Sequence, residues 1–173
     1  MTSGAPTYGR IWRPALLVLV ALSVTACGSS STAASRSRPT IADTTTTTKP
    51  LTLSERYKLV VSDGDAQLQR LSAELSTANG NVPLIQAKFR EVAATYRHVA
   101  AQVQAMSFPP SVRADVTAMT GALATLATDS DEGARAATLA QFNAVFTRLA
   151  ADQKAEVTAN NAVNHDLGIS SIS

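Results

Sequence analysis

Reactive side chains are scarce in this chain of 173 residues, which contains one cysteine, Cys27, and two histidines, His98 and His165. One cysteine cannot form an intramolecular disulfide or a cysteine-rich zinc site. Di-iron helical bundles need a Glu-x-x-His pair on each of two helices, whereas Glu91 and His98 are seven residues apart. We therefore expect no metal and no cofactor, with His98 on an outer helix face and His165 in a polar tail.

Other catalytic patterns are also missing from the sequence. It contains no Gly-x-Ser-x-Gly elbow, no glycine-rich phosphate loop and no His-Glu-x-x-His motif. Two acidic groups remain, Asp63 with Asp65, and Asp129 with Asp131 and Glu132. We interpret both groups as solvated or capping carboxylates, so we expect no catalytic residue and do not expect an enzyme.

Residues 1–26 have the order of parts that is typical of a signal peptide. Arg10 and Arg13 provide a positive flank, and the apolar run Ala-Leu-Leu-Val-Leu-Val-Ala-Leu follows at 15–22. Counted generously to Ala26, this run has about 12 residues, whereas a membrane-spanning helix needs about 20. The segment therefore predicts a cleaved signal peptide rather than a permanent membrane anchor.

The sequence Val24-Thr25-Ala26-Cys27 resembles the lipobox of bacterial lipoprotein precursors, although Val24 replaces the commoner Leu. The resemblance implies cleavage between Ala26 and Cys27, after the Cys27 thiol has received a diacylglyceryl group carrying acyl chains such as palmitate. It places the protein on the extracytoplasmic face of the cell membrane, with the membrane as a partner. Two alternatives stay open: ordinary signal cleavage that leaves Cys27 free, and an uncleaved anchor.

The net charge does not favour a nucleic-acid partner. The whole chain has 15 Lys and Arg against 13 Asp and Glu, and removing Arg10 and Arg13 leaves 13 against 13. From Leu51 onward the count is 10 positive against 12 negative residues. Without a basic stripe or a stacking platform, nucleic-acid binding is not expected.

Residues 27–50 are rich in Ser and Thr, with five consecutive threonines at Thr44 to Thr48. Such a composition cannot form a core and predicts a disordered tether. Treated as a flexible coil, the 23 residues from Gly28 to Pro50 span about 26 Å on average. The composition is weakly similar to that of actinobacterial proteins. Tethers of this kind in exported actinobacterial proteins often carry O-linked sugars, so the resemblance implies such sugars on this segment.

Residues 51–168 show helical periodicity, and the first predicted helix begins at a capping box formed by Thr52 and Glu55. It ends at Asn79-Gly80, with Gly64 as a weak point in its interior. The second predicted helix runs from about Pro83 to Met106 and ends before two prolines. Its apolar residues follow spacings of four and three: Ile85, Phe89, Val92, Tyr96, Val99, Val103 and Met106.

Ser111 is expected to cap a third helix of about 17 residues, with Asp129 and Glu132 marking the start of a fourth. The fourth helix is expected over about 132–166, with Gly168 as its end. Its apolar face (Leu139, Phe142, Phe146, Leu149) fades into Gln153, Lys154 and Glu156. The third helix carries many small residues, which we expect to pack within the bundle, with the close approach of a partner helix as the alternative: Thr117, Ala118, Thr120, Gly121, Ala122, Ala124 and Thr125.

Short connections between these helices predict an all-α, up-down-up-down four-helix bundle. Phe89 and Phe146 are its expected aromatic core, and Phe108 in a turn is expected to contribute less. A three-helix bundle with a loosely attached first helix is the structural alternative. The polar end of the fourth helix is expected to extend beyond the third and to fray, with contact to another protein as the alternative, and 169–173 form a flexible tail.

Functionally, the sequence favours a membrane-anchored envelope lipoprotein that displays its bundle for interaction with another envelope protein. A carrier that holds an apolar ligand or lipid within the bundle is the alternative. A pocket of several hundred Å³ would favour the carrier, and a filled core with an exposed apolar patch would favour the interaction protein.

Replacing Cys27 by Ala tests the anchor, because the thioether needs the thiol. Stable membrane attachment takes two signals, which a diacylglyceryl group provides. We expect the wild-type protein to incorporate labelled palmitate and to partition into detergent. The variant should lose the label and remain as uncleaved precursor or soluble protein. Equal labelling of the two proteins would contradict the lipobox interpretation.

Overall fold

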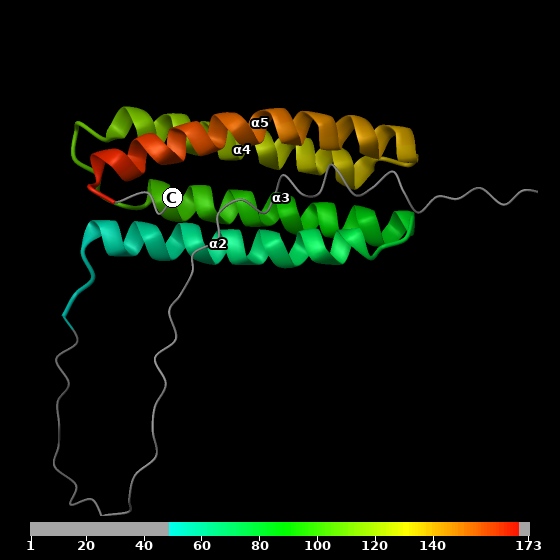
Figure 1. Ribbon diagram of the computed structural model, residues 1–173, viewed down its shortest axis with the longest axis horizontal. Coiled ribbons are helices and arrows are strands. Elements are labelled where there is room, and N and C mark those ends of the chain that lie inside the picture. The colour runs from blue at the N-terminus through cyan, green and yellow to red at the C-terminus, as the bar shows by residue number, and fades with distance from the viewer. Residues whose placement is uncertain (1–48, 170–173) are drawn as a thin grey trace, which may run out of the picture.

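The computed structural model describes residues 49–169 and contains four antiparallel helices in this range: α2 (Leu53–Ser76), α3 (Val82–Gln104), α4 (Arg113–Arg135) and α5 (Leu139–Asp166) (Figure 1). No strand occurs among the described residues. The expected all-α four-helix bundle is confirmed, and the three-helix alternative is wrong. The predicted signal peptide at 1–26, Cys27, nearly all of the tether and the last four residues of the predicted tail lie outside the described residues.

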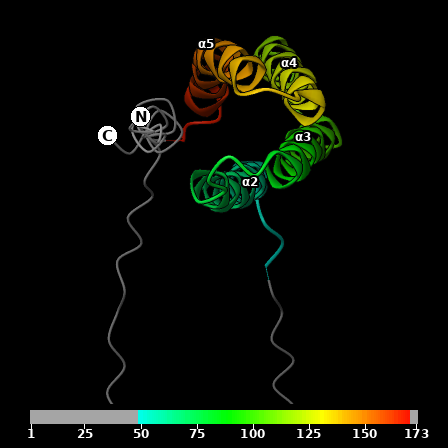
Figure 2. The ribbon, with the colours of Figure 1, turned by 90° about the vertical axis from the view of Figure 1, so that its right-hand side faces the viewer.

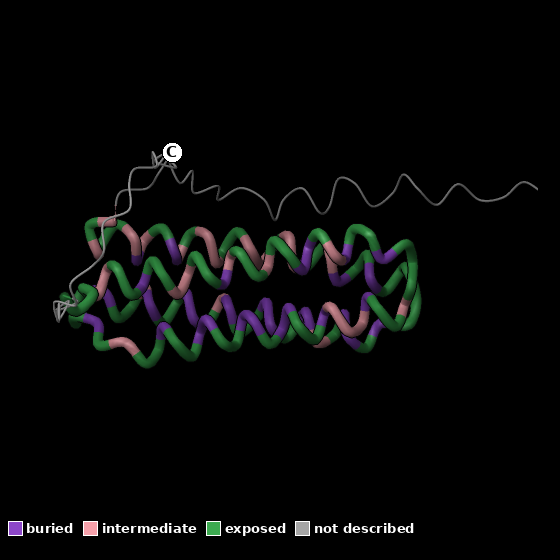
Figure 3. Tube along the Cα trace, turned by 90° about the horizontal axis from the view of Figure 1, so that it is seen from below, coloured by how far each residue is buried: buried purple, intermediate pink, exposed green. Residues whose placement is uncertain are grey.

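The four helices form an arc when the bundle is viewed along its axis (Figure 2). In this arc α3 packs against both α2 and α4, and α4 packs against α5. Buried positions recur along the helices where they face their neighbours (Figure 3). The first and last helices, α2 and α5, therefore stand at the two ends of the arc.

The α2 helix begins where the sequence predicts. The Glu55 amide donates to Thr52 Oγ1 at 3.2 Å, and the Thr52 amide donates to Glu55 Oε2 at 2.7 Å. The helix continues through Gly64, which is buried where α2 crosses α3. A Cβ at this position would lie 2.4 Å from Val99 Cγ2. Gly64 is thus a close helix–helix contact rather than a break in the helix.

The seven apolar residues that the sequence predicts on one face of the second helix form the centre of the core. Six of them, from Ile85 to Val103 in α3, are buried. Phe89 contacts two aromatic rings of α5: its ring centroid lies 6.0 Å from that of Phe142 and 5.2 Å from that of Phe146. Phe146 is half-buried. Phe108 is buried and meets Tyr57 edge-on at 6.1 Å, so this turn residue is part of the core as well; its smaller contribution stays a prediction.

The predicted boundary between the third and fourth helices is wrong. Ser111 does not cap α4, since the N-cap is Val112 and makes no side-chain hydrogen bond. The helix also continues to Arg135, which places Asp129 and Glu132 in its last turns. The side chain of Thr138 accepts from the Gln141 amide at 3.3 Å and begins α5 instead.

Packing explains why α4 continues through the expected break. Ser130 is fully buried and its hydroxyl donates to the Leu126 carbonyl at 2.7 Å. Gly133 lies against the ring of Phe89. Because α4 has 23 residues rather than about 17, the expected overhang of α5 is also wrong, and Val163 near its end is buried.

The small residues of α4 lie mostly on its outer face. Thr117, Ala118, Ala124 and Thr125 are exposed, and a Cβ added to Gly121 would meet nothing within 4 Å. Thr120 is the buried member of the set. The expectation that the whole set packs within the bundle is therefore wrong.

Two glycines of the same helix provide a matched test of this packing. In Gly133→Ala the new methyl group would lie 2.5 Å from Phe89 Cδ1, so we expect a loss of about 1–3 kcal/mol in the free energy of unfolding. In Gly121→Ala the methyl group enters open space, and we expect a gain of up to about 1 kcal/mol from helix propensity. Denaturant unfolding of both variants measures the difference. Equal effects at both positions would contradict the Phe89 packing.

Candidate ligand-binding cleft

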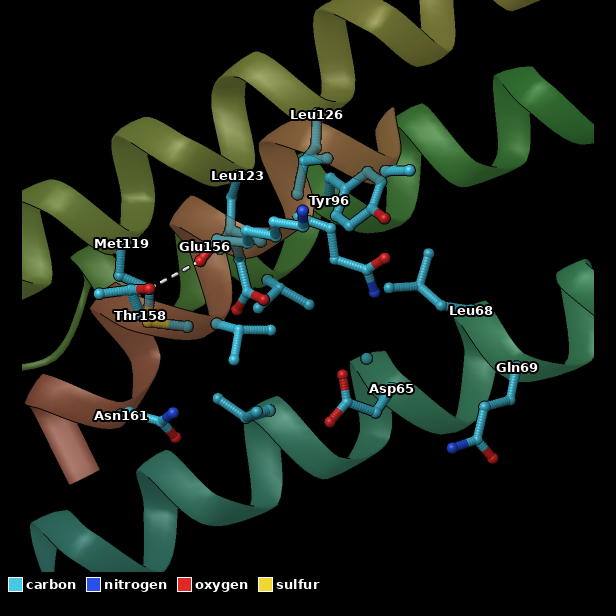
Figure 4. Close-up of a pocket in the computed structure, with 17 residues that line it drawn as sticks. Asp65, Leu68, Gln69, Tyr96, Met119, Leu123, Leu126, Glu156, Thr158 and Asn161 are labelled. Carbon is cyan, nitrogen blue, oxygen red and sulfur yellow. Dashed lines mark hydrogen bonds between the residues drawn. The ribbon is translucent and has the colours of Figure 1, made fainter. Parts of the chain in front are cut away.

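A cleft with a volume of about 490 Å³ lies between α2 and α5, with residues of α3 and α4 at its base (Figure 4). All four helices contribute to it, because the arc leaves its two end helices apart. Most of the lining is apolar, and its larger aliphatic side chains come from every helix: Leu68, Val99, Met119, Leu123, Leu126 and Val157.

Hydrogen bonds close the cleft at the end where α2 begins and α5 ends. The Tyr57 hydroxyl donates to Asn160 Oδ1 at 2.6 Å, and both side chains are buried. Asn164 Nδ2 lies 3.4 Å from the same oxygen. Nearby, Ser54 Oγ donates to the Leu167 carbonyl at 3.1 Å. These contacts join the two end helices and define one limit of the cleft.

Apolar side chains narrow the cleft toward the opposite end of the bundle. There Phe146 and Leu149 of α5, with Leu68 and Leu75 of α2, line a separate and much smaller space of about 40 Å³. Leu68 and Tyr96 line both this space and the large cleft. The large cleft is therefore bounded along the bundle axis and opens sideways between α2 and α5.

Two carboxyl groups enter this apolar space from opposite walls, Asp65 from α2 and Glu156 from α5 (Figure 4). Burial raises the pKa of Asp65 to about 6. Burial also raises the pKa of Glu156 to about 7, with repulsion from Asp65 as a second cause. Burial, reinforced by the same two carboxylates, raises the pKa values of Tyr57 and Tyr96.

Helical register explains how α5 presents polar groups to the cleft. From Phe142 the spacing of four and three continues without interruption through Phe146, Leu149, Gln153, Glu156, Asn160 and Val163. The apolar face therefore does not end at Leu149; it continues with polar residues at core positions. This register is the signal in the sequence that could have identified Glu156 and Asn160, which our sequence analysis missed.

The expected role of the acidic residues is wrong in part. Asp63 is exposed, as expected, whereas Asp65 lines the cleft and is not a solvated carboxylate. At the other acidic group, Asp131 pairs with Arg97. Asp129 and Glu132 both pair with Arg148, with 3.2 Å between Arg148 Nε and Asp129 Oδ1. These acids form ion pairs between helices rather than capping a helix start.

The two histidines lie away from the cleft. His98 is exposed on α3, as the periodicity predicts. His165 is exposed near the end of α5, where Nδ1 lies 3.2 Å from Asp166 Oδ1. Within residues 49–169, no three His, Cys, Asp or Glu side chains are grouped so that they could hold a metal ion.

Comparison of the chain with protein-family models, with curated proteins and with solved structures gave no significant match. The assignment of a function therefore depends on the cleft itself and on the lipobox resemblance.

The raised pKa values of Asp65 and Glu156 predict how stability depends on pH. Their ordinary values are 3.8 and 4.5, so the folded chain holds these protons more tightly than the unfolded chain. The stability contribution is therefore complete below about pH 4 and is lost as the pH rises through about 6 to 7. Thermal melting between about pH 5 and pH 8 should show a falling midpoint. Besides these two acids, the charged residue in the lining of the cleft is Lys154.

The double variant Asp65→Asn, Glu156→Gln should flatten this profile, because both titrating groups are removed. It should also melt at a higher temperature than the wild-type chain near pH 8. Asp63→Asn is the matched control on α2 and should retain the wild-type slope. A wild-type midpoint that rises steadily from pH 5 to pH 8 would contradict the burial of the two carboxyl groups.

Proposed function

We propose that this protein is a lipid-anchored protein of the cell envelope that holds an apolar ligand in the cleft between α2 and α5. The cleft is the observation that carries the proposal. Its volume of about 490 Å³ lies within the range of about 300–1,000 Å³ that is typical of small-molecule sites. Its mainly apolar lining, with a few polar groups, is also typical of such sites.

The packing of the bundle favours a ligand over a protein partner as the occupant. A role in protein interaction would be supported by a filled core and one continuous apolar patch. The large exposed apolar side chains within 49–169 instead come from four different segments: Leu51, Leu59, Leu84 and Leu139. Uncovered apolar side chains lie next to one another in the wall of the cleft.

The proposed anchor depends on the lipobox Val24-Thr25-Ala26-Cys27. Among the described residues, no helix is long and apolar enough to cross a bilayer. A diacylglyceryl group on Cys27 would hold the helical domain within reach of the membrane through the tether at 28–50. An apolar ligand is poorly soluble in water, so a carrier held at the membrane stays close to the phase in which such a ligand is found.

Binding of N-phenyl-1-naphthylamine, a neutral dye that fluoresces in apolar surroundings, tests the cleft. The exported chain (27–173, with Cys27→Ser) should bind the dye saturably. Ala150 lines the cleft and Ala151 beside it is exposed, so Ala150→Trp should fill the cleft while Ala151→Trp leaves it open. We expect dye affinity to fall at least about tenfold in Ala150→Trp and to stay unchanged in Ala151→Trp.

Circular dichroism of both tryptophan variants shows whether the bundle remains folded. A wild-type chain that does not bind the dye would contradict the proposed function. Equal dye affinity in a folded Ala150→Trp variant would place the binding outside the cleft and would also contradict it.

A further inference from the structure

The two carboxyl groups in the cleft have no cationic partner among the residues that the structure describes, unlike five other acids of the bundle: Glu74, Glu91, Asp129, Asp131 and Glu132. Within residues 49–169, neither Asp65 nor Glu156 makes a hydrogen bond or an ion pair. Glu74, by contrast, lies 2.6 Å from Lys88 Nζ, and this contact lowers its pKa. The cleft thus contains two partly buried acids that no Lys or Arg side chain of the described residues neutralises.

Lys154 is the basic residue of the cleft lining, and it does not neutralise this pair. Its side chain is exposed, and it forms no ion pair with Glu156 in the described part of the chain. The remaining polar lining comes from neutral side chains such as Gln69, Gln153 and Asn161. Among the described residues, no basic side chain therefore pairs with the two carboxyl groups in the space between α2 and α5.

Burying a carboxylate without a partner is costly, and a cation placed beside it recovers much of that cost. A cation that also carries an apolar chain would cover the aliphatic wall at the same time. A neutral amphiphile would cover the wall but leave the acids unpaired, and an anionic one would be repelled. Charge and apolar surface together select one class of occupant.

We propose, on the basis of the function proposed above, that the α2–α5 cleft binds an amphiphilic amine. Its ammonium group lies between Asp65 of α2 and Glu156 of α5. Its apolar chain packs along the aliphatic wall formed by Leu68, Leu123 and Leu126. The two carboxylates thereby determine the specificity of the site, and the wall provides the apolar contact area.

Three probes with the same twelve-carbon chain test this charge preference: dodecylamine, dodecanol and dodecanoate. Each is titrated at about pH 7.5, below its micelle concentration or, for dodecanol, its solubility limit, against the exported chain with bound N-phenyl-1-naphthylamine. We expect dodecylamine, as its ammonium ion, to displace the dye at a concentration at least about tenfold lower than dodecanol. Dodecanoate should be the weakest of the three. This comparison uses the wild-type sequence in the cleft and needs no variant there.

Variants then assign the preference to the two acids. In Asp65→Asn, Glu156→Gln the advantage of dodecylamine over dodecanol should fall to about twofold or less, while dodecanol binding remains. The control Asp63→Asn, Asp115→Asn removes the same number of negative charges outside the cleft. It should retain the full preference. Circular dichroism confirms that each variant is folded.

The outcomes separate this inference from the proposed function. If all three probes displace the dye equally, or if dodecanol or dodecanoate binds best, the amine is wrong and the apolar-ligand function stands. If the preference persists in the folded double variant, Asp65 and Glu156 do not determine it and the inference is also overturned. If neither dye nor probe binds, the proposed function fails and the inference fails with it.

Discussion

The hydrogen bond from the Tyr57 hydroxyl to Asn160 Oδ1, at 2.6 Å, joins the first helix of the bundle to the last. Both side chains are buried, so breaking this bond would leave polar atoms without water, at a cost of about 1–3 kcal/mol. The bond holds α2 and α5 together at one end of the bundle. Farther along, Asp65 and Glu156 face the space between the same helices, and closing that space would desolvate two carboxylates. The two helices therefore meet at one end and stay apart in the middle.

At the base of the cleft, α3 packs tightly against its two neighbours, α2 and α4. Gly64 allows α2 to approach Val99 of α3, and Gly133 allows α4 to receive the ring of Phe89. At both positions a single methyl group would collide with a side chain of α3. Because α3 is held on both sides by such contacts, the cleft has a well-packed base. The walls, α2 and α5, lack an equivalent partner along their facing sides, which is why an opening forms there.

The use of charge differs between the outside of the bundle and the cleft. Outside the cleft, several acids pair with basic side chains, as in the contacts of Asp129 and Glu132 with Arg148. Exposed pairs contribute little to stability, but each one neutralises the acid that takes part in it. In the cleft, Asp65 and Glu156 are half-buried and unpaired. Residues that lower stability at core positions are common at binding sites, and this contrast is the physical basis of the proposed site.

Local signals in the sequence determined the helices, since the capping box of Thr52 and the stripe of α3 depend on neighbours within a few residues. The lipobox resemblance is likewise a property of the sequence, and the anchor remains a prediction. The α4–α5 boundary could not be predicted, because burial of Ser130 and the contact of Gly133 with Phe89 outweigh the capping tendency of Asp129. The cleft was decided by the tertiary structure alone. Asp65 and Glu156 are 91 residues apart in the sequence, and only the packing of α3 and α4 between their helices makes them face each other.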